Sequence, residues 1–426
     1  MKEAVSMNAV SNRRAKRLIL TGVAGLSALA LAGCASGGGG GGGGGEASGP
    51  LVLYTWAASE GDQAQWADFI SGAQAEDPDL DISVEGPSFS DYWTKVKTRL
   101  SGANPPCLLT TQAARAQELG DLLMPLDDLI EKSGFDIENI DESMLSGMTV
   151  DGTIRAIPYD AEPIVLFYNV EAFQAAGLEL PGATYTRDQF VSDAKALTDG
   201  DKKGLALAPG IFIPNAWSLA DGVPAVTEDG ELDLTNPEFV EQIQSFFDLV
   251  AVEGVAKAPE AADGSEVSQQ AFTSGEVPML IEGPWMYGSF ADAADFTLGV
   301  SIVPSTSGEA AAMTAGSGFG IAANCDRPDE AFAAIEALTS LSVQEKQAEA
   351  RGIVPARIEA LPAWAEGKTE GSSEVVEALL SNATPQRTTP TWNQVETLMT
   401  QYGVQGYRGE LTAEEIMDTI TNSVAG

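Results

Sequence analysis

The sequence of 426 residues contains no histidine and only three cysteines. Without histidine, the chain cannot build a Ser-His-Asp or Cys-His catalytic system, or a metal site with imidazole ligands. The spacing of Cys107 and Cys325 matches no metal motif, so we predict no metal and no cofactor. In an oxidising compartment these two cysteines could form a disulfide or remain two buried thiols, and we favour buried thiols.

Basic residues are also scarce, with 23 Lys and Arg against 62 Asp and Glu and a formal net charge of −39. This charge makes nucleic acids and anionic membrane surfaces poor partners. The acidic residues are spread along the chain, which is typical of a solvated surface and does not indicate a specific cation site. A cationic solute nevertheless remains open as a ligand.

The hydrophobic run 18–32 follows four basic residues between positions 13 and 17, and it is too short to span a membrane. Its length and flanking charge predict a secretory signal segment over residues 1–33. The run ends Leu-Ala-Gly-Cys, which resembles the lipobox of bacterial lipoproteins. The resemblance implies that Cys34 carries a lipid anchor at the extracellular face of the cell membrane, in a Gram-positive bacterium.

Glycines occupy every position from 37 to 45. The whole segment 34–50 lacks apolar periodicity, so we predict a flexible tether. A tether of this length reaches on the order of 20 Å. The folded part would then contact the membrane only through the lipid.

The chain beyond residue 50 is longer than one hydrophobic core usually organises, so we expect two domains. Its first part alternates predicted strands and helices, which indicates a βαβαβ unit with a parallel sheet. The predicted strands are 51–56, 82–85 and 107–110, and the predicted helices are 60–76 and about 92–100. Further along, capping-box spacing predicts helix starts at Thr186, Ser342 and Thr412.

The segment 271–288, AFTSGEVPMLIEGPWMYG, is built around one tryptophan. A short apolar strand, 277–281, is ended by a Gly-Pro pair, which leaves Trp285 just past the carboxyl end of the strand. Open α/β sheets bind ligands at this end. Trp285 could therefore stack on a ligand, or it could cap the core, and the segment alone leaves both interpretations open.

Four parts of the chain resemble, in their order and spacing, the family 1 extracellular solute-binding proteins. They are 151–190, which begins DGTIRAIPYDAEPIVLFYN; 272–285, FTSGEVPMLIEGPW; 316–340, GSGFGIAANCDRPDEAFAAIEALTS; and 347–357. The similarity covers nearly all of residues 51–426. It implies an α/β fold of the periplasmic-binding-protein type II, with two α/β lobes, a central ligand cleft and crossing hinge segments.

The resemblance and the order of the segments also imply domain boundaries. They place residues 51–158 and 304–323 in the N-terminal lobe, and residues 159–303 and 324–426 in the C-terminal lobe. The connector between Pro158 and Pro163 would be the first crossing between the lobes.

The family's ligand-binding positions correspond to a defined set of residues here. They are Glu162 and Asp160 on the first crossing, Trp285 after its strand, Trp217, Trp392, Trp56 and Thr111. For each of them, packing inside a lobe remains an alternative, whereas Trp66 and Trp93 are expected in the core. This sequence has Gln112 and Ala113 where maltose-binding members carry charged contacts, so the sugar itself is not defined.

The function implied by the resemblance is capture of a carbohydrate, expected to be an oligosaccharide, by a monomer that delivers it to the permease of an ABC importer. Aromatic rings would hold the apolar faces of the sugar, and carboxylates would accept its hydroxyl groups. We expect no enzymatic activity. Two alternatives stay open: a carbohydrate-active enzyme with paired carboxylates, and a binder of another solute such as a peptide or a polyamine.

Overall fold

The computed structural model of the chain describes residues 49–102 and 104–425. The predicted signal segment 1–33, Cys34 and the glycines 37–45 lie outside the described residues. Within the described part, no helix combines the length and the apolar character that crossing a membrane requires.

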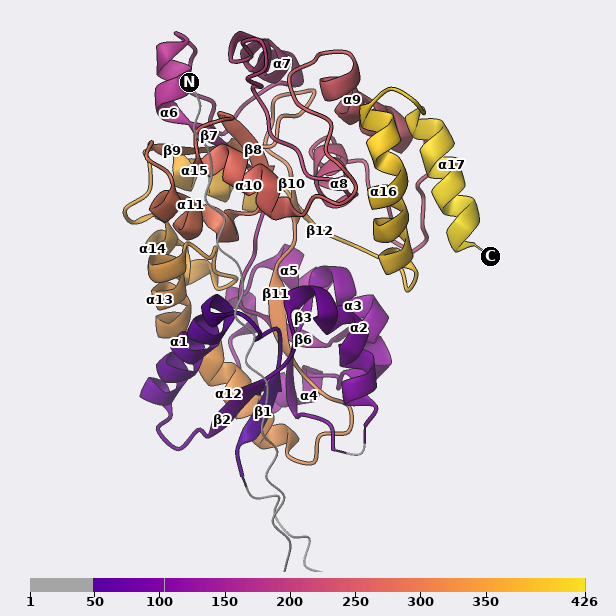
Figure 1. Ribbon diagram of the computed structural model, residues 1–426. Helices are drawn as coiled ribbons and strands as arrows, with labels where there is room; N and C mark the ends of the chain where they lie inside the picture. The colour runs from indigo at the N-terminus through magenta and orange to yellow at the C-terminus, as the bar shows by residue number, and fades with distance from the viewer. Residues whose placement is uncertain (1–48, 103, 426) are drawn as a thin grey trace, which may run out of the picture. The chain divides into compact units, whose positions relative to one another are not determined.

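The first sheet confirms the predicted βαβαβ unit (Figure 1). Its strands, in spatial order, are β2 (Ile82–Glu85), β1 (Leu51–Tyr54), β3 (Leu108–Gln112), β11 (Ser317–Ile321) and β6 (Ala156–Pro158). β1 pairs in parallel with β2 and β3, because α1 (Glu60–Glu76) and α2 (Phe89–Leu100) return the chain between consecutive strands. β11 comes from much later in the sequence and is antiparallel to β3 and β6.

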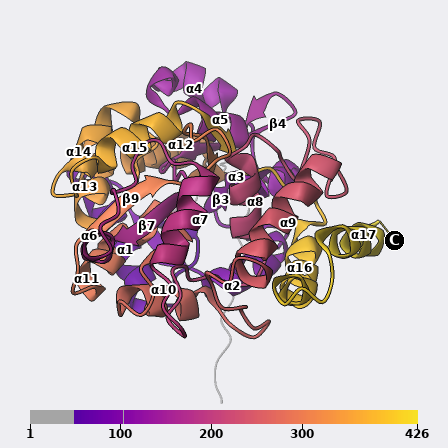
Figure 2. The same cartoon turned by 90° about the horizontal axis from the view of Figure 1, so that it is seen from above.

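The second sheet has three antiparallel strands in the order β8 (Met279–Glu282), β7 (Val165–Asn169) and β9 (Leu298–Ile302). The strands β7 and β8 are buried almost throughout, because helices pack around the sheet (Figure 2). The same apolar core takes residues from α6 (Val170–Ala175), α7 (Arg187–Ala196), α8 (Phe212–Leu219), α9 (Pro237–Ala251), α10 (Ser265–Thr273), α11 (Tyr287–Ala293), α15 (Ser372–Leu380), α16 (Trp392–Tyr407) and α17 (Ala413–Val424).

Six further α-helices and four further β-strands belong to the described part of the chain. They are α3 (Ala113–Leu119), α4 (Asp127–Ser133), α5 (Glu142–Gly147), β4 (Thr149–Val150), β5 (Thr153–Ile154), β10 (Ala312–Thr314), α12 (Pro328–Leu338), α13 (Leu341–Arg351), α14 (Leu361–Ala365) and β12 (Ala383–Pro385). In addition, β10 pairs with β12 and β4 pairs with β5 as separate two-stranded sheets.

Two of the three predicted capping boxes are present. Thr186 caps α7 and Thr412 caps α17, and in each case the third helical residue bonds back to the cap. The prediction at Ser342 is wrong, because α13 begins after Ser340. The hydroxyl of Ser342 instead donates to Glu76 at the end of α1.

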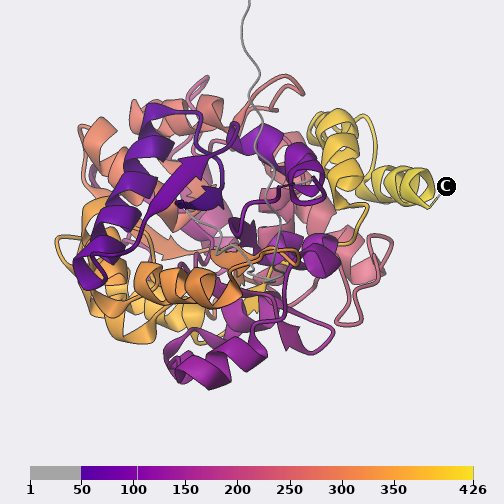
Figure 3. The same ribbon diagram turned by 90° about the horizontal axis from the view of Figure 1, so that it is seen from below.

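Two separate apolar cores define the lobes, and their boundaries differ from the predicted ones. The core around the first sheet includes Phe332 and Ile335 of α12, which packs against α1 (Figure 3). The core around the second sheet includes Met313 of β10. We therefore assign β10 to the second lobe and α12 to the first lobe. The reason is that the apolar face of α12 complements α1, whereas β10 pairs with β12.

Three segments connect the lobes. The first runs from β6 to β7, the second from β10 to β11, and the third from α13 to α15. The first matches the crossing expected between Pro158 and Pro163, because β6 belongs to the first sheet and β7 to the second.

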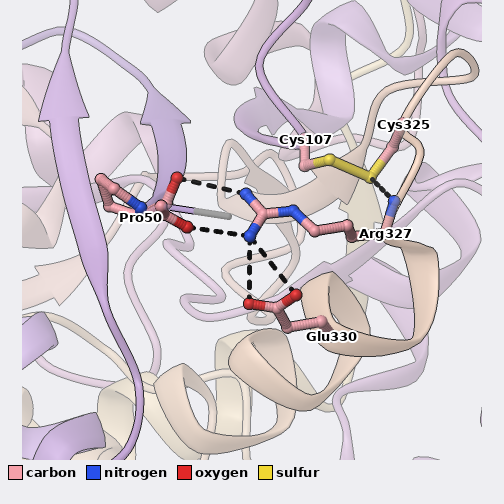
Figure 4. Close-up of a disulfide and its surroundings, with 6 residues drawn as sticks. Pro50, Cys107, Cys325, Arg327 and Glu330 are labelled. Atoms are coloured by element: carbon pink, nitrogen blue, oxygen red, sulfur yellow. Dashed lines mark hydrogen bonds and ion pairs between the residues drawn. A yellow bond between two sulfur atoms is a disulfide. The ribbon is translucent and has the colours of Figure 1, made fainter. Parts of the chain in front are cut away.

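The preference for buried thiols was wrong, because Cys107 and Cys325 form a disulfide (Figure 4). Cys107 directly precedes β3 and Cys325 follows β11, and these neighbouring antiparallel strands bring the two residues to the same edge of the first sheet. Nearby, the guanidinium of Arg327 donates to the carbonyls of Gly49 (2.9 Å) and Pro50 (3.2 Å). The start of the described chain is thus fixed to the beginning of α12.

Candidate functional site

Two carboxyl groups lie on the segment that crosses from β6 to β7. Asp160 is 7% exposed and Glu162 is 1% exposed. Asp160 accepts a hydrogen bond from the backbone N–H of Ser317, the first residue of β11. Between the two acids, the N–H of Ala161 donates to the carbonyl of Val354 (2.9 Å). All three segments that connect the lobes therefore meet at these two carboxyl groups.

Glu162 is buried without a hydrogen-bond partner for either side-chain oxygen among the described residues. Burial raises the pKa of Glu162 well above its usual value, and the neighbouring Asp160 raises it further. The backbone N–H groups of Val354 and Trp285 lie close enough to oppose this shift, although neither reaches hydrogen-bond geometry. The acceptor capacity of this carboxyl group is thus free.

Lys368 is a positive charge that acts on Glu162. Its ammonium group lies 4.6 Å from the ring centroid of Trp364 and 5.0 Å from that of Tyr287. Burial lowers the pKa of Lys368 to about 8, and the charge of Glu162 opposes this shift. Burial has the opposite effect on the carboxyl group of Asp160, whose pKa it raises. Sequence reasoning missed Lys368, because no motif surrounds it.

Trp285 lies on a single 3-10 turn, η3 (Pro284–Met286), directly after β8. The expected place of this residue past the carboxyl end of the strand is confirmed. Its side chain is half-buried, and its ring centroid lies 6.3 Å from that of Phe212. A Cβ atom on Gly283 would lie 2.0 Å from the indole, so glycine lets the ring fold back over the chain. The backbone N–H of Trp285 lies near Glu162.

Trp217 and Trp392 are fully buried in the core of the second lobe. The indole N–H of Trp217 donates to the hydroxyl of Ser245 (3.0 Å), and the guanidinium of Arg187 lies 4.2 Å from its ring centroid. The indole nitrogen of Trp392 is buried without a partner among the described residues. This burial favours packing over ligand stacking at both positions.

Trp56 and Thr111 are buried in the first lobe, at 8% and 0% exposure. The ring of Trp56 contacts several aromatic rings: those of Trp66, Phe89, Tyr92 and Trp93. The expectation that Trp66 and Trp93 belong to the core is confirmed, since both are buried. Of the predicted ligand-binding residues, the structure brings Asp160, Glu162 and Trp285 together, places Trp217, Trp392 and Trp56 in the lobe cores, and buries Thr111 in the first lobe.

Two surface cavities lie away from this group of residues. One, of about 510 Å³, is lined by residues 220–223, which follow α8, by residues of α9 and by the loop around Thr306. The other, of about 490 Å³, lies beside α1 and β2. Each is lined by residues of a single lobe, and neither includes a carboxyl group of the crossing segments. We therefore consider the region around Glu162 and Trp285 the candidate binding site.

Two α/β lobes joined by crossing segments define a periplasmic-binding-protein type II fold. Residues 69–370 match the family described as bacterial extracellular solute-binding protein. The chain belongs to this family.

Relatives in sequence are distant. The chain is 23% identical to the arabinooligosaccharide-binding protein of Halalkalibacterium halodurans, over 58% of this chain and 56% of the relative. It is 26% identical to the sn-glycerol-3-phosphate-binding periplasmic protein UgpB of Rhizobium meliloti, over 59% of this chain and 61% of the relative. The chain thus spans only about three-fifths of the length of these relatives.

Solved structures are similar in fold along most of the chain. The substrate-binding protein Lmo0181 of Listeria monocytogenes, in complex with cycloalternan, has a TM-score of 0.78 at 21% identity, covering 88% of this chain and 97% of that one. The GacH receptor of Streptomyces glaucescens, studied unliganded and with acarbose, has a TM-score of 0.74 at 22% identity, covering 88% and 98%. At these identities the likeness establishes the fold alone.

Proposed function

We propose that this chain is the substrate-binding lipoprotein of an ABC importer, and that it captures a carbohydrate, an oligosaccharide by expectation, outside the cell and delivers it to the permease. Membership of the solute-binding family supports this proposal. So do similar proteins, one named for an arabinooligosaccharide and others solved with cycloalternan or acarbose.

The observation that carries the proposal is the unpartnered carboxyl group of Glu162, which lies near the backbone N–H of Trp285, a residue whose indole is half-buried. A pyranose has apolar C–H faces and a belt of hydroxyl groups, so the indole would cover a face while Glu162 accepts hydroxyl hydrogens. A buried polar group without a partner is costly, and a ligand hydroxyl would remove that cost. The ligand thereby stabilises the arrangement in which both lobes enclose it.

Delivery follows from this coupling between binding and lobe arrangement. The permease would recognise the liganded arrangement of a monomer, and Cys34 would hold the protein at the membrane by its lipid. No step of this cycle breaks a bond in the solute, so the sugar should be recovered intact after incubation. Mass spectrometry that detects cleavage would instead support the carbohydrate-active enzyme.

Lys368 favours a second candidate ligand, a phosphorylated glycerol, since one relative is named for sn-glycerol-3-phosphate. Its ammonium could pair with a phosphate near the crossing segments. The adjacent buried carboxyl groups of Asp160 and Glu162 would repel the same phosphate when ionised. We therefore place the carbohydrate first.

A thermal-shift screen of the purified protein tests the proposal. The panel contains mono- and oligosaccharides, glycerol phosphates and their diesters, amino acids, peptides and polyamines. A ligand at about 100 times its dissociation constant adds roughly 2.7 kcal/mol to the free energy of unfolding. Stabilisation by a saccharide alone supports the proposal. Stabilisation only by a glycerol phosphate, peptide or polyamine would replace it with another solute class.

A further inference from the structure

Besides the connecting segments, one charged side chain among residues 49–102 and 104–425 bonds directly from one lobe to the other. Arg115 lies on α3, which follows β3 of the first sheet. Its guanidinium donates to Oδ1 of Asn393 (2.6 Å) and to Oε2 of Glu396 (3.0 Å), both on α16 of the second lobe. Next to it, the hydroxyl of Thr388 donates to the carbonyl of Ala114. We call the contacts among Arg115, Asn393 and Glu396 the Arg115 bridge.

The first lobe holds Arg115 in position for this bridge. The residue is only 7% exposed, and its guanidinium lies 5.2 Å from the ring centroid of Trp93 on α2. Glu118, one turn further along α3, lies 3.5 Å from the guanidinium and also pairs with Lys97 of α2 at 2.7 Å. Because these contacts stay within one lobe, they orient the side chain whether or not α16 is close.

We propose that the Arg115 bridge is an interlobe latch, which stabilises the arrangement of the lobes shown here before any ligand binds. Its two bonds exist only while α3 and α16 adjoin, so they favour that arrangement and no other. The bond to Glu396 is charge-assisted, and the low exposure of Arg115 limits screening by solvent. Arg115 therefore acts as a positioning residue for the binding site and contacts no ligand itself.

The latch also has a consequence for ligand binding. This consequence rests on the proposed function, whereas the latch itself does not. A protein whose competent arrangement is more populated binds its ligand with a correspondingly lower apparent dissociation constant. If a variant lowers the fraction of protein in the competent arrangement by tenfold, the apparent dissociation constant should rise by about tenfold, although no ligand contact is lost.

The experiment measures the distance between the lobes in the ligand-free full chain. Spin labels are placed at Thr98→Cys on α2 and Asp418→Cys on α17, both exposed positions, in a Cys34→Ser background with the native disulfide oxidised. Double electron–electron resonance then gives the distance distribution. The unaltered bridge should give one dominant short distance.

Two variants weaken the bridge, and one matched control does not. Arg115→Gln removes the charge, and Glu396→Gln removes the charge at the half-exposed partner while keeping an acceptor. Arg99→Gln is the control, because Arg99 pairs with Glu85 inside the first lobe (2.6 Å). We expect a longer-distance population to rise about tenfold in Arg115→Gln and less in Glu396→Gln. The double variant should be no more open than Arg115→Gln alone, since the bond that Glu396→Gln weakens is already absent in Arg115→Gln.

A dominant long distance in the parent protein would overturn the proposal, and so would distributions that both bridge variants leave unchanged. An equal shift in Arg99→Gln would also overturn it, since that would indicate a general loss of charge. If Arg115→Gln fails to fold, Glu396→Gln decides alone. Because no ligand is added, a negative ligand screen leaves this result untouched, and the two proposals can fail separately.

Discussion

At the scale of single residues, Glu162 is the most unusual side chain of the candidate site. Its two oxygens are buried and unpartnered among the described residues, and Asp160 lies two positions away. Proteins avoid this combination unless a partner arrives, because desolvating an ionised carboxylate costs far more than desolvating a neutral one. Without ligand, protonation is the available way to reduce that cost, which explains the direction of the pKa shift.

This shift predicts how stability depends on pH. The native state holds a proton on Glu162 and Asp160 at pH values where the unfolded chain, with pKa values near 4, has lost it. The native state therefore binds more protons above about pH 4, and the free energy of unfolding falls as the pH rises. Glu162→Gln should therefore become progressively more stable than the parent as the pH increases. We expect its free energy of unfolding to be higher by on the order of 1 to 3 kcal/mol at pH 8.

The control for this prediction is Glu370→Gln, which removes the same charge at an exposed position. Melting curves from pH 5 to pH 8 compare the three proteins. If the difference between Glu162→Gln and the parent stays constant with pH, or if Glu370→Gln reproduces it, the carboxyl group is not the source of the effect.

Trp285 and Trp217 provide a second test at this scale, because one is half-buried and the other fully buried. Trp285→Ala should weaken carbohydrate binding by about 5- to 150-fold, as expected for loss of aromatic stacking worth roughly 1 to 3 kcal/mol, with a small change in melting temperature. Trp217→Ala should instead cost about 3 to 5 kcal/mol of stability. Calorimetry and melting curves separate the two. Unchanged binding in Trp285→Ala would remove this ring from the site.

The sequence predicted the position of Trp285 and the burial of Trp66 and Trp93, but it left open whether Trp217, Trp392 and Trp56 are buried. A Gly-Pro pair after an apolar run determines the end of β8 locally, so the residue after it could be placed. The environment of Trp217 depends on Arg187, Ser245 and two helices distant in sequence. Lys368 was missed for the same reason, since its partners come together only through the tertiary fold.

At the scale of secondary-structure elements, β11 is the strand that joins distant parts of the first lobe. It enters the sheet between β3 and β6, and the Cys107–Cys325 disulfide links it to the start of β3. The alternation of strands and helices predicted β1, β2 and β3, because each connection there is local. The pattern contained no information about a strand arriving two hundred residues later, so the disulfide could not be inferred.

The disulfide closes a loop with a sequence separation of 218 residues. Cross-linking so long a segment restricts the unfolded chain strongly, so Cys107→Ser combined with Cys325→Ser should lower stability by about 2 to 5 kcal/mol. Denaturant melts of the parent, with and without a reductant, should differ by a similar amount. Mass spectrometry of unreduced peptides checks the bond itself. Finding both thiols free in protein purified under oxidising conditions would contradict the structure.

Helix starts were predictable to the extent that their caps are local. The boxes at Thr186 and Thr412 combine the cap and its partner within four residues. At Ser342 the same spacing occurs, but the hydroxyl has a stronger partner in Glu76 of α1. The packing of α12 on α1 is likewise not local in sequence, and it is the reason we assign α12 to the first lobe.

At the scale of the whole molecule, the carboxyl pair and the Arg115 bridge lie on different connections between the same two lobes. Asp160 bonds to the start of β11, so the first and second connecting segments are coupled by a side chain. The Arg115 bridge joins α3 to α16 outside those segments. A ligand at Glu162 would thus act where the connections meet, while Arg115 determines how often the lobes adjoin beforehand.

The proposed lipid anchor should be separable from the folded part of the chain. Both apolar cores lie within residues 49–425, and Arg327 bonds to the carbonyls of Gly49 and Pro50, the last two residues of the predicted tether, which fixes these two residues to the first lobe. Cys34→Ser should therefore leave the melting temperature and ligand affinity unchanged while moving the protein from the membrane fraction to the soluble fraction.

The expected modification at Cys34 is a diacylglycerol, because a single acyl chain gives only marginal membrane binding. Fractionation of cells, together with metabolic labelling by a fatty acid, measures both effects. The double Cys107→Ser and Cys325→Ser variant is the control, since it should lose stability yet remain labelled and membrane-bound. Retention of Cys34→Ser in the membrane fraction, or a label that persists on it, would place the anchor elsewhere. In that case the predicted glycine tether would not be needed to separate the lobes from the membrane.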